Sequence, residues 1–256
     1  MSKIAVVVQT TQPPETAVVI PAYNEEANIE KIVRDTKSSS PKSLVIVVDD
    51  GSLDKTSEIA KKHGAVVIKN PVNLGKSEST KKAAKYIFEN HPEVKAIALI
   101  DADNQYSARD LPRIIKPVIN NEADFVIGRR DFSDIPRFGH RPGIKVFAFL
   151  FNVLYGTSFI DTVCGLRAIS AEALKRMELK SSGYAVESEM LVDAVKKKMR
   201  ISIVPVKVRY QRRHTLRKGT TMLLNIILHL ILWKFFDRKV VENKMLKILR
   251  LYQKIV

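Results

Sequence analysis

Two aspartates follow a short apolar run in this 256-residue sequence. The run covers residues 96–100, and Asp101 and Asp103 come directly after it. In an extended segment, side chains at positions i and i+2 point the same way, so both carboxylates can hold one divalent ion. Hard oxygen ligands suit Mg²⁺ or Mn²⁺, and the oxygens of a substrate diphosphate complete such a shell. The pair therefore predicts a metal site that also binds a diphosphate.

Two adjacent carboxylates, Asp49 and Asp50, end a second apolar run at residues 44–48. Carboxylates at the end of a buried strand are costly unless a cation or a set of hydrogen-bond donors meets them. A helix N-cap supplied by Ser52 or Asp54 would explain those two residues, but it would not explain both aspartates. The pattern therefore indicates a second group of polar residues at a strand end.

The turn after the first apolar run reads Pro-Ala-Tyr-Asn-Glu-Glu at residues 21–26. It is neither the glycine-rich turn of a dinucleotide site nor a P-loop, which disfavours a dehydrogenase or an NTPase. Pro21 fixes the turn, while Tyr23 and Glu25 offer a ring face and an acceptor to a planar base. Asn24 is also a suitable cap for the helix that follows, and the two interpretations are compatible.

These residues need a scaffold that brings them together. Short runs rich in Val and Ile alternate with segments of helical periodicity over roughly the first 130 residues. Such alternation predicts an α/β fold with a parallel sheet covered on both faces, in which ligands bind beyond the carboxyl ends of the strands. We expect strands at 17–20, 44–48, 65–68, 96–100 and 125–127, and helices at 25–36, 54–63, 75–89 and 108–119.

The alternation stops after about residue 130. Pro and Gly indicate a loop at 137–142, and apolar or periodic stretches follow it. We expect helices at 144–154, 185–198, 222–236 and 238–255, and a strand at 201–208.

Four motifs stand along the first half of the chain in a fixed order. They read PAYNE at 21–25, DDGS at 49–52, NLGK at 73–76 and DAD at 101–103. Together they resemble the inverting family-two glycosyltransferases of GT-A fold, and residues 125–130 continue the match. Residues 161–167 and 184–190 are similar to later stretches of the dolichol-phosphate mannose synthases and related polyprenyl-phosphate glycosyltransferases, the narrower group that the chain most resembles.

The resemblance implies a GT-A, Rossmann-like domain over residues 1–220, with a mixed, mostly parallel sheet flanked by helices. Its nucleotide-binding half would cover about 16–130 and its acceptor half about 131–220. The implied reaction moves a hexose, with inversion, from a nucleotide-sugar of the GDP-mannose or UDP-glucose type to a polyprenyl (dolichyl) phosphate, with Mg²⁺ or Mn²⁺ as cofactor. A soluble or glycan hydroxyl acceptor stays open, and it would need a base, for which Asp161 or Glu189 is the best candidate.

Roles for individual residues follow from the same resemblance. The nucleotide-sugar would be bound by Pro21, Tyr23, Glu25, Val48, Asp50, Asp101, Ala102, Asp103, Arg130, Arg212 and Lys218. The metal would be held by Asp101, Asp103 and Gln105, and the acceptor phosphate by Arg130, Arg141 and Lys145. The catalytic set would be Asp101, Asp103, Arg130, Arg212 and Lys218.

Two of these assignments have local alternatives. Arg212 and Lys218 keep the six-residue spacing of the family's diphosphate-binding pair, but the Gly-x-Ser-Lys sequence expected around Lys218 reads Thr-Leu-Arg-Lys. Arg213 and Arg217 therefore compete with Lys218 for the diphosphate. A separate alternative concerns the acceptor cations at 141 and 145, which also fit an ordinary solvated junction between a loop and a helix.

Positive charge gathers in residues 207–256, which hold 13 Lys/Arg against 2 Asp/Glu, or +11 of the +16 net charge. These cations are interleaved with Leu and Ile rather than with stacking aromatic residues, which disfavours a nucleic-acid partner and favours an anionic membrane surface. As a helix, 222–236 is shorter than the roughly 30 Å hydrocarbon core. We expect it to lie on the membrane with Trp233, Phe235 and Phe236 in the interfacial layer, or else to pack on the catalytic domain.

The single cysteine, Cys164, excludes an internal disulfide and a cysteine-based zinc site. The start of the sequence shows no charged region followed by an apolar one, so we predict no signal peptide. We therefore expect a cytoplasmic protein, held peripherally on the cytoplasmic face of a membrane.

Overall fold

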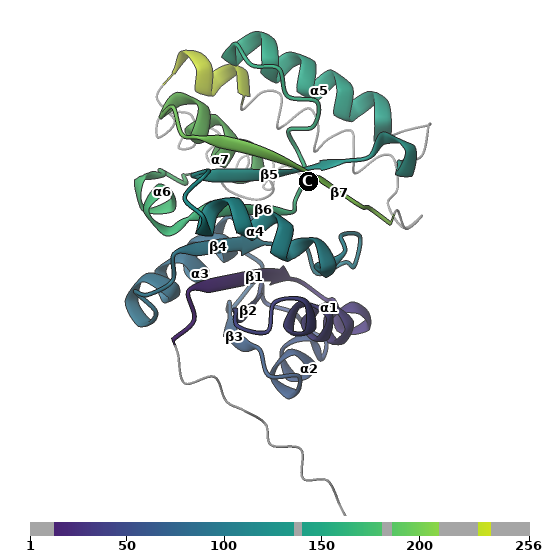
Figure 1. The fold of residues 1–256 in the computed structure, drawn as a ribbon. Helices are drawn as coiled ribbons and strands as arrows, with labels where there is room; N and C mark the ends of the chain where they lie inside the picture. Colours follow the sequence, from purple (N-terminus) through teal and green to yellow (C-terminus); the bar gives the residue numbers. More distant parts are fainter. Residues whose placement is uncertain (1–12, 136–139, 181–185, 210–229, 237–256) are drawn as a thin grey trace, which may run out of the picture.

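A computed structural model describes residues 13–135, 140–180, 186–209 and 230–236 (Figure 1). The strands are β1 (Thr16–Ala22), β2 (Leu44–Asp49), β3 (Val66–Lys69), β4 (Ala96–Leu99), β5 (Phe125–Arg130), β6 (Arg167–Ser170) and β7 (Ile201–Val206). The helices are α1 (Glu26–Ser39), α2 (Thr56–Lys62), α3 (Lys76–Asn90), α4 (Leu111–Ile119), α5 (His140–Tyr155), α6 (Ala171–Arg176) and α7 (Val186–Lys196). Two 3₁₀ turns are η1 (Ala108–Asp110) and η2 (Phe132–Asp134), and residues 230–235 are also helical.

The described strands form one sheet in the order β3-β2-β1-β4-β6-β5-β7. Neighbouring strands are parallel except at β6, which runs antiparallel to both β4 and β5. Helices lie on both faces of the sheet (Figure 1), which is why β1, β2 and β4 are buried almost throughout and consist largely of Val, Ile, Leu and Ala. The mixed, mostly parallel α/β class expected from the sequence is confirmed.

The helices pack through apolar stripes of helical spacing. In α1 the buried residues are Ile29, Ile32, Val33 and Thr36, which lie three or four positions apart and face the sheet. Helix α4 contacts α1 and packs on β4, β5 and β6, whereas α3 packs on β1 and β2. The sheet order is therefore fixed by helices that cross over between parallel strands.

The order of the strands reverses between β1 and β4, because β2 and β3 lie on one side of β1 and β4 lies on the other. Ligands of open α/β sheets bind beyond the carboxyl ends of strands at such a point. The turns after β1, β2, β4 and β5 all lie at that edge of the sheet, and the loop that leads into the antiparallel β6 arrives at the same edge. The motifs of the sequence are thus gathered at one place.

The second half of the chain differs from expectation in two respects. Strand β6 and helix α6 were not predicted, because β6 is only four residues long and begins with a buried arginine, Arg167. Helix α5 begins at His140, within the stretch expected to be a loop, so Arg141 belongs to a helix. Strands β6 and β7 complete the sheet of the first half, so the described parts of the two predicted halves share one core.

Residues 230–236 pack on the domain rather than away from it. Leu230 and Trp233 are fully buried, the Tyr155 hydroxyl donates to the Leu230 carbonyl (3.0 Å), and the Lys196 ammonium donates to the Trp233 carbonyl (2.6 Å). The expected interfacial position of Trp233 is therefore wrong, because its ring belongs to the hydrophobic core. The other residues of the helices expected at 222–236 and 238–255 lie outside the described residues.

Within the described ranges, no helix has the length and apolar character needed to cross a membrane.

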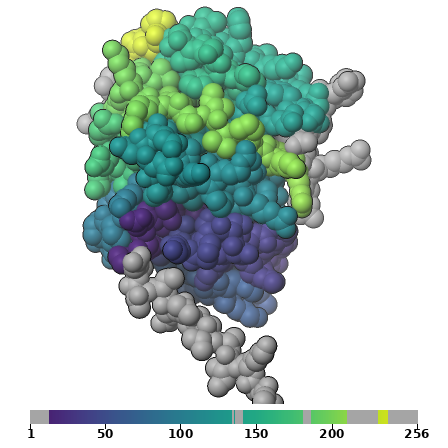
Figure 2. All heavy atoms as spheres, viewed as in Figure 1, coloured from purple at the N-terminus to yellow at the C-terminus, as the bar shows by residue number. Residues whose placement is uncertain are grey.

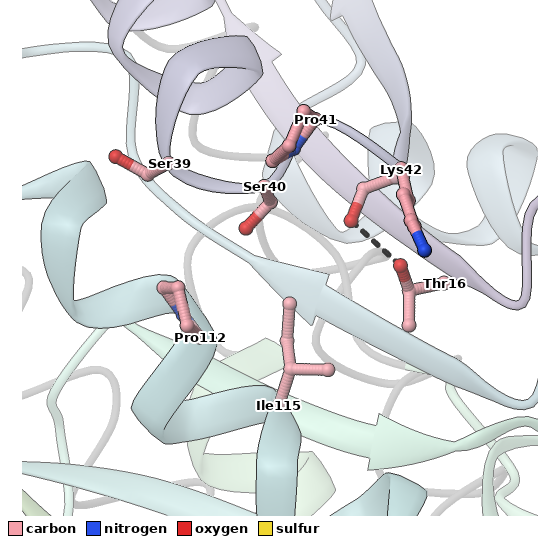
Figure 3. A pocket seen from close by; sticks show the side chains of 8 residues that line it. Thr16, Ser39, Ser40, Pro41, Lys42, Pro112 and Ile115 are labelled. Carbon is pink, nitrogen blue, oxygen red and sulfur yellow. Dashed lines mark hydrogen bonds between the residues drawn. The ribbon is translucent and has the colours of Figure 1, made fainter. Parts of the chain in front are cut away.

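A hollow of about 250 Å³ opens between the end of α1 and α4 (Figure 3). It is lined by Thr16, Ser39, Ser40, Pro41, Lys42, Ser43, Pro112 and Ile115. Because Thr16 begins β1, this hollow lies at the amino edge of the sheet, opposite the edge where the motifs meet.

Candidate active site

The turns after β1 and β2 are tied together by hydrogen bonds. The backbone N–H of Asn24 donates to the Ser52 hydroxyl (2.9 Å), and the Asn24 side-chain oxygen accepts from the backbone N–H of Leu53 (3.0 Å). Asn24 has a positive φ of 53°, a conformation that asparagine tolerates better than most residues. The expectation that Asn24 caps α1 is wrong, because the capping position is Glu25 and Asn24 joins the two turns instead.

The predicted nucleoside-binding residues differ in accessibility. Tyr23 is 43% exposed, and Glu25 is partly exposed with its carboxylate accepting from the Asn28 amide (2.6 Å). Pro21 is half-buried at the end of β1. Val48 is fully buried in β2, where it pairs with strands on both sides, so its side chain offers no surface to a base. Tyr23 and Glu25 are therefore the better placed of these residues.

Asp49 is buried and its carboxylate is occupied by donors from the protein. One oxygen accepts from the backbone N–H of Ser52 (2.8 Å), and the other accepts from the Ser57 hydroxyl. The Lys69 ammonium lies 3.7 Å from the same second oxygen. These contacts supply the donors and the cation that a buried carboxylate requires, so Asp49 shapes the turn before α2.

Asp50 is also buried, and it organises a different segment. Its carboxylate accepts from the Asn70 amide (2.7 Å) and from the backbone N–H groups of Leu74 (2.9 Å) and Gly75 (2.8 Å). Gly75 has a φ of 89°, which glycine adopts without strain, and α3 begins at the next residue. Asp50 therefore positions the start of α3, and only its small exposed edge is left for a nucleoside.

Asp101 meets a lysine that the sequence analysis did not assign. The Lys76 ammonium, at the first position of α3, bridges the carboxylates of Asp101 and Glu187, the latter at the start of α7. Burial by itself would lower the pKa of Lys76, but the two carboxylates outweigh it and hold that pKa above the ordinary lysine value. Lys76 is therefore a cation that joins three elements at the site.

Asp103 lies where negative charge is in excess. Its pKa is raised to about 6, chiefly by burial and also by the neighbouring charges of Asp101 and Glu25, while the Gln105 N–H and Lys76 act in the opposite direction. The carboxylate accepts from the backbone N–H of Gln105 (3.0 Å). A raised pKa means that the surroundings do not balance the charge of this carboxylate, which is the environment in which a divalent cation would be stabilised.

The described residues do not complete a metal site by themselves. Nowhere in the described part of the chain do three or more Asp, Glu, His or Cys side chains converge on one point. Asp101 keeps 28% of its side chain exposed, so an ion there can reach other ligands. Ala102 is buried between the two aspartates, and Gln105 is half-buried with its carbonyl accepting from the Arg209 N–H (2.8 Å). The arrangement fits an ion that takes its remaining ligands from a substrate.

The loop before β6 closes over Asp101. A Cβ atom on Gly165 would overlap a carboxylate oxygen of Asp101, so a larger residue here would displace the Asp101 side chain. The backbone N–H of Gly165 donates to the buried Tyr106 hydroxyl (2.9 Å). Arg167, which is fully buried, donates to the carbonyls of Cys164 (2.6 Å), Thr162 (2.9 Å) and Glu187. Arg167 therefore holds both this loop and the residue that pairs with Lys76.

Arg130, which was expected to face a phosphate, is engaged within the protein. Its guanidinium is buried at the end of β5 and forms a bidentate ion pair with Asp161 (2.7 and 2.8 Å). The expected role of Asp161 as a base is equally restricted, because both oxygens of its buried carboxylate are bound to Arg130. Glu189, the other base candidate, is fully buried and accepts from the backbone N–H of Lys180 (2.7 Å).

Arg141 and Lys145 lie in the first half of α5, beside the turn that follows β5. The Arg141 guanidinium donates to the carbonyls of Ile135 and Ser133, and it remains partly exposed. Lys145 is exposed, and its ammonium lies 5.8 Å from the centroid of the Phe132 ring. Two cations therefore border the turn that follows β5 at the motif edge, which fits an anionic group outside the Arg130–Asp161 pair.

Two residues of the predicted site are not described by the structure, and two residues that the structure places at the site had no predicted role. Arg212 and Lys218 lie outside the described residues, so their placement at the diphosphate stays a prediction. Lys76 and Glu187 were not assigned a role, although both stand within stretches that carried the family resemblance. Their role depends on contacts between α3, β4 and α7, which spacing along the chain does not reveal.

A substitution of Lys76 tests this bridge. Lys76→Met should lower the free energy of unfolding by about 1–3 kcal/mol, because two partly buried carboxylates lose their shared cation. Mn²⁺ without nucleotide should stabilise the variant more than the parent chain, since the ion no longer competes with the ammonium. Thermal melts with and without Mn²⁺ measure both effects, and Lys85→Met, at an exposed position of the same helix, serves as control. An Mn²⁺ effect equal to that of the parent would show that Lys76 does not compete for Asp101.

Comparison with known proteins places this geometry in a wider group. The family model described as "Glycosyl transferase family 2" matches residues 17–177. The chain is 30% identical to the UDP-N-acetylglucosamine–dolichyl-phosphate N-acetylglucosaminyltransferase of Methanococcus voltae, over 80% of this chain and 90% of that protein. It is also 30% identical to the dolichyl-phosphate hexose transferase of Haloferax volcanii, over 78% of this chain and 86% of that protein.

A solved structure extends the likeness to the fold. Glucosyl-3-phosphoglycerate synthase of Mycobacterium tuberculosis, in complex with Mn²⁺, UDP-glucose and phosphoglyceric acid, superposes with a TM-score of 0.69. The match covers 86% of this chain and 79% of that chain, at 24% sequence identity. At this identity the match supports the arrangement of strands and helices, and it leaves the substrates to be argued from the site.

Proposed function

Because the chain belongs to glycosyl transferase family 2, we propose that it transfers a hexose from a nucleotide-sugar to a polyprenyl phosphate, with inversion and with the help of a divalent metal. The observation that carries the proposal is the pair Asp101 and Asp103, which lies beyond β4 at the switch point of the sheet and has an unbalanced carboxylate. The names of the dolichyl-phosphate relatives support the acceptor class.

The donor would lie across the turns after β1 and β4. Tyr23 and Glu25 border the place of the nucleobase, and Asp101 and Asp103, with Gln105 beside them, would hold Mg²⁺ or Mn²⁺ against the diphosphate. When bound, the ion supplies Lewis-acid stabilisation of the leaving diphosphate. Lys76 binds the same carboxylate from α3 when no ion is bound, so the ion would compete with it for Asp101. Arg212 and Lys218 remain our proposed cationic partners of the diphosphate.

The contacts of the two carboxylates considered as bases favour an acceptor that is already an anion. A hydroxyl acceptor requires a carboxylate that can reach and take its proton. Asp161 is bound by Arg130, and Glu189 is buried and bound to the backbone, so neither is available for this step. A polyprenyl phosphate is charged at neutral pH, and it needs orientation by cations rather than deprotonation. Arg141 and Lys145 are placed to provide that orientation.

Substitution of Arg141 separates the acceptor role from the donor role. Arg141→Ala should bind nucleotide as the parent chain does, while transfer to polyprenyl phosphate should fall by about a hundredfold, because a cation that orients the attacking phosphate is lost. Calorimetry with the nucleoside diphosphate and an assay of sugar transfer provide the two readouts. Arg34→Ala, at an exposed position of α1, is the matched control. A large loss of nucleotide affinity would place Arg141 in the donor site instead.

The nucleobase and the sugar can be identified by ligand-induced stabilisation. A ligand present at 100 times its dissociation constant stabilises the folded state by about 2.7 kcal/mol. A panel of GDP, UDP and their sugars with Mn²⁺ should therefore raise the melting temperature clearly for one base. A panel in which no nucleotide acts, with or without metal, would contradict the donor class.

The acceptor class is tested by a pair of lipids that differ only in the phosphate. With the nucleotide-sugar that the melting-temperature panel identifies as donor, sugar should be transferred to polyprenyl phosphate and not to the corresponding polyprenol. Transfer to the polyprenol would show that the enzyme deprotonates a hydroxyl, and the acceptor proposal would then be wrong.

We further propose that the enzyme works at the cytoplasmic face of a membrane, where it would reach such an acceptor from the membrane surface.

A further inference from the structure

Helix α5 is apolar on two faces. Its inner face is buried in the core through Ile144, Phe147, Ala148 and Phe151. The opposite side also carries large apolar side chains, with exposed fractions of 49% for Val146, 65% for Phe149 and 66% for Val153. A surface helix of a soluble domain ordinarily has polar residues on its solvent-facing side. We therefore infer that this side of α5 contacts a partner.

The exposed residues form one stripe. Positions 146, 149 and 153 are three and four residues apart, which places their side chains on the same side of a helix. The stripe is extended by the segment 230–236, in which Ile231, Phe235 and Phe236 are exposed by 40%, 69% and 60%. We call these six residues the apolar face.

The two parts of the apolar face are adjacent. The hydroxyl of Tyr155, at the end of α5, donates to the carbonyl of Leu230, and the Lys234 ammonium lies 5.4 Å from the centroid of the Tyr155 ring. Figures 1 and 2 show the 230–235 segment, in yellow, beside α5 at the same end of the molecule. The two parts of the apolar face therefore meet at the end of α5.

The two segments that carry the apolar face hold charge of one sign. Residues 140–160 and 230–236 contain no Asp or Glu, although the whole chain has 27. Lys145 and Lys234 are exposed in these same two segments. Apolar side chains that are flanked by lysines and free of acids are the composition of helices that lie in the head-group layer of an anionic bilayer.

The position of the stripe agrees with this partner. Helix α5 is 16 residues long, or about 24 Å, so it can lie along a membrane surface without crossing it. The stripe begins directly after Lys145, the residue proposed to meet the acceptor phosphate. A bilayer in contact with the stripe would bring lipid phosphates to the height of Arg141 and Lys145.

We propose that the apolar face is a docking surface for an anionic bilayer, with α5 in the plane of the interface and Phe149 among the acyl chains. The inference deepens the proposed function, on which it rests for the reason that the enzyme should meet a membrane. It adds the catalytic domain itself to the membrane contact, beside the basic residues near the end of the chain.

Vesicle binding by the full chain tests this docking surface without donor or acceptor. The double substitution Phe149→Ser with Val153→Ser should weaken partition onto phosphatidylglycerol-containing vesicles at least about tenfold, because the apolar burial of two side chains is lost. The same fall should persist at high salt, which does not screen apolar contacts. Ile203→Ser, at an exposed position of β7, is the matched control and should leave partition unchanged.

A fluorescent label reports which surface touches the lipid. Cys164 is fully buried, so a cysteine introduced by Phe149→Cys can be labelled selectively with an environment-sensitive dye. Its emission should shift to the blue on anionic vesicles, whereas a label placed by Ile203→Cys should not respond. Circular dichroism of each variant verifies that the fold is retained.

Three results would overturn the proposal. One is unchanged partition of the double variant, and another is an equal response of the two labels. The third is a dimer in light scattering that the double substitution dissociates while vesicle binding persists, which would make the apolar face a contact between copies of the chain. Because no sugar is transferred in these experiments, a failure of the proposed reaction would leave their outcome unaffected.

Discussion

Asp101→Asn and Asp103→Asn are each expected to reduce sugar transfer by about a thousandfold or more while the protein stays folded. Each substitution removes a negative charge from the pair that would hold the metal against the donor diphosphate. Neither aspartate is part of the hydrophobic core. Asp101 is partly exposed, and Asp103 has an unbalanced charge whose removal should not destabilise the fold. The loss should therefore appear in turnover and in metal-dependent nucleotide binding. The melting temperature of the metal-free protein should stay unchanged for Asp103→Asn and fall slightly for Asp101→Asn, because Lys76 then keeps only Glu187 as its carboxylate partner.

Asp35→Asn, at an exposed position of α1, is the matched control and should keep full activity. Isothermal calorimetry with nucleoside diphosphate, in the presence of Mn²⁺ and then of excess EDTA, measures the coupling of metal and nucleotide. Nucleotide affinity that is insensitive to EDTA in the parent chain, together with full activity of both variants, would exclude a metal role for these aspartates.

The second large effect concerns stability. Arg130→Ala should lower the free energy of unfolding by about 3–5 kcal/mol, since it leaves the buried carboxylate of Asp161 without its partner. For a chain of this size, each kcal/mol corresponds to roughly 2–4 °C in melting temperature. The variant should thus lose activity because part of it is unfolded at assay temperature, and addition of more acceptor should not restore it.

A double substitution distinguishes this explanation from a direct phosphate contact. Arg130→Met combined with Asp161→Leu removes both charges together, so it should be markedly more stable than Arg130→Ala alone. If Arg130→Ala melts like the parent chain but has lost its affinity for polyprenyl phosphate, Arg130 touches the acceptor as the sequence had suggested. Chemical denaturation of the parent chain, Arg130→Met, Asp161→Leu and the double variant closes a double-mutant cycle and gives the interaction energy of the pair.

The Val- and Ile-rich runs predicted the first five strands to within a few residues, because fully buried parallel strands carry a continuous apolar signal. The gathering of 21–26, 49–52 and 101–105 at one edge followed from the same pattern, since parallel strands end on one side. Strand β6 was not predicted because it is short, antiparallel and begins with Arg167. The burial of Arg167 depends on carbonyls from two other segments.

The division of labour among the acidic residues could not be read from the chain. Asp49 and Asp50 are adjacent, yet one is bound from the turn before α2 and the other from the loop before α3. Arg130 looked available because its partner, Asp161, comes from a distant loop. Lys76 had no assigned role for the same reason. These are long-range contacts, which local propensity and spacing do not encode.

The most direct test of the account is transfer of a labelled sugar by the purified full chain. The protein is incubated with the labelled nucleotide-sugar that stabilises it, with Mn²⁺ and with polyprenyl phosphate in anionic vesicles, and the lipid is then extracted into organic solvent. Label should enter the organic phase, and excess EDTA should prevent this. Label that stays in the aqueous phase under all these conditions, or that reaches the lipid equally well in EDTA, would contradict a metal-dependent polyprenyl-phosphate glycosyltransferase.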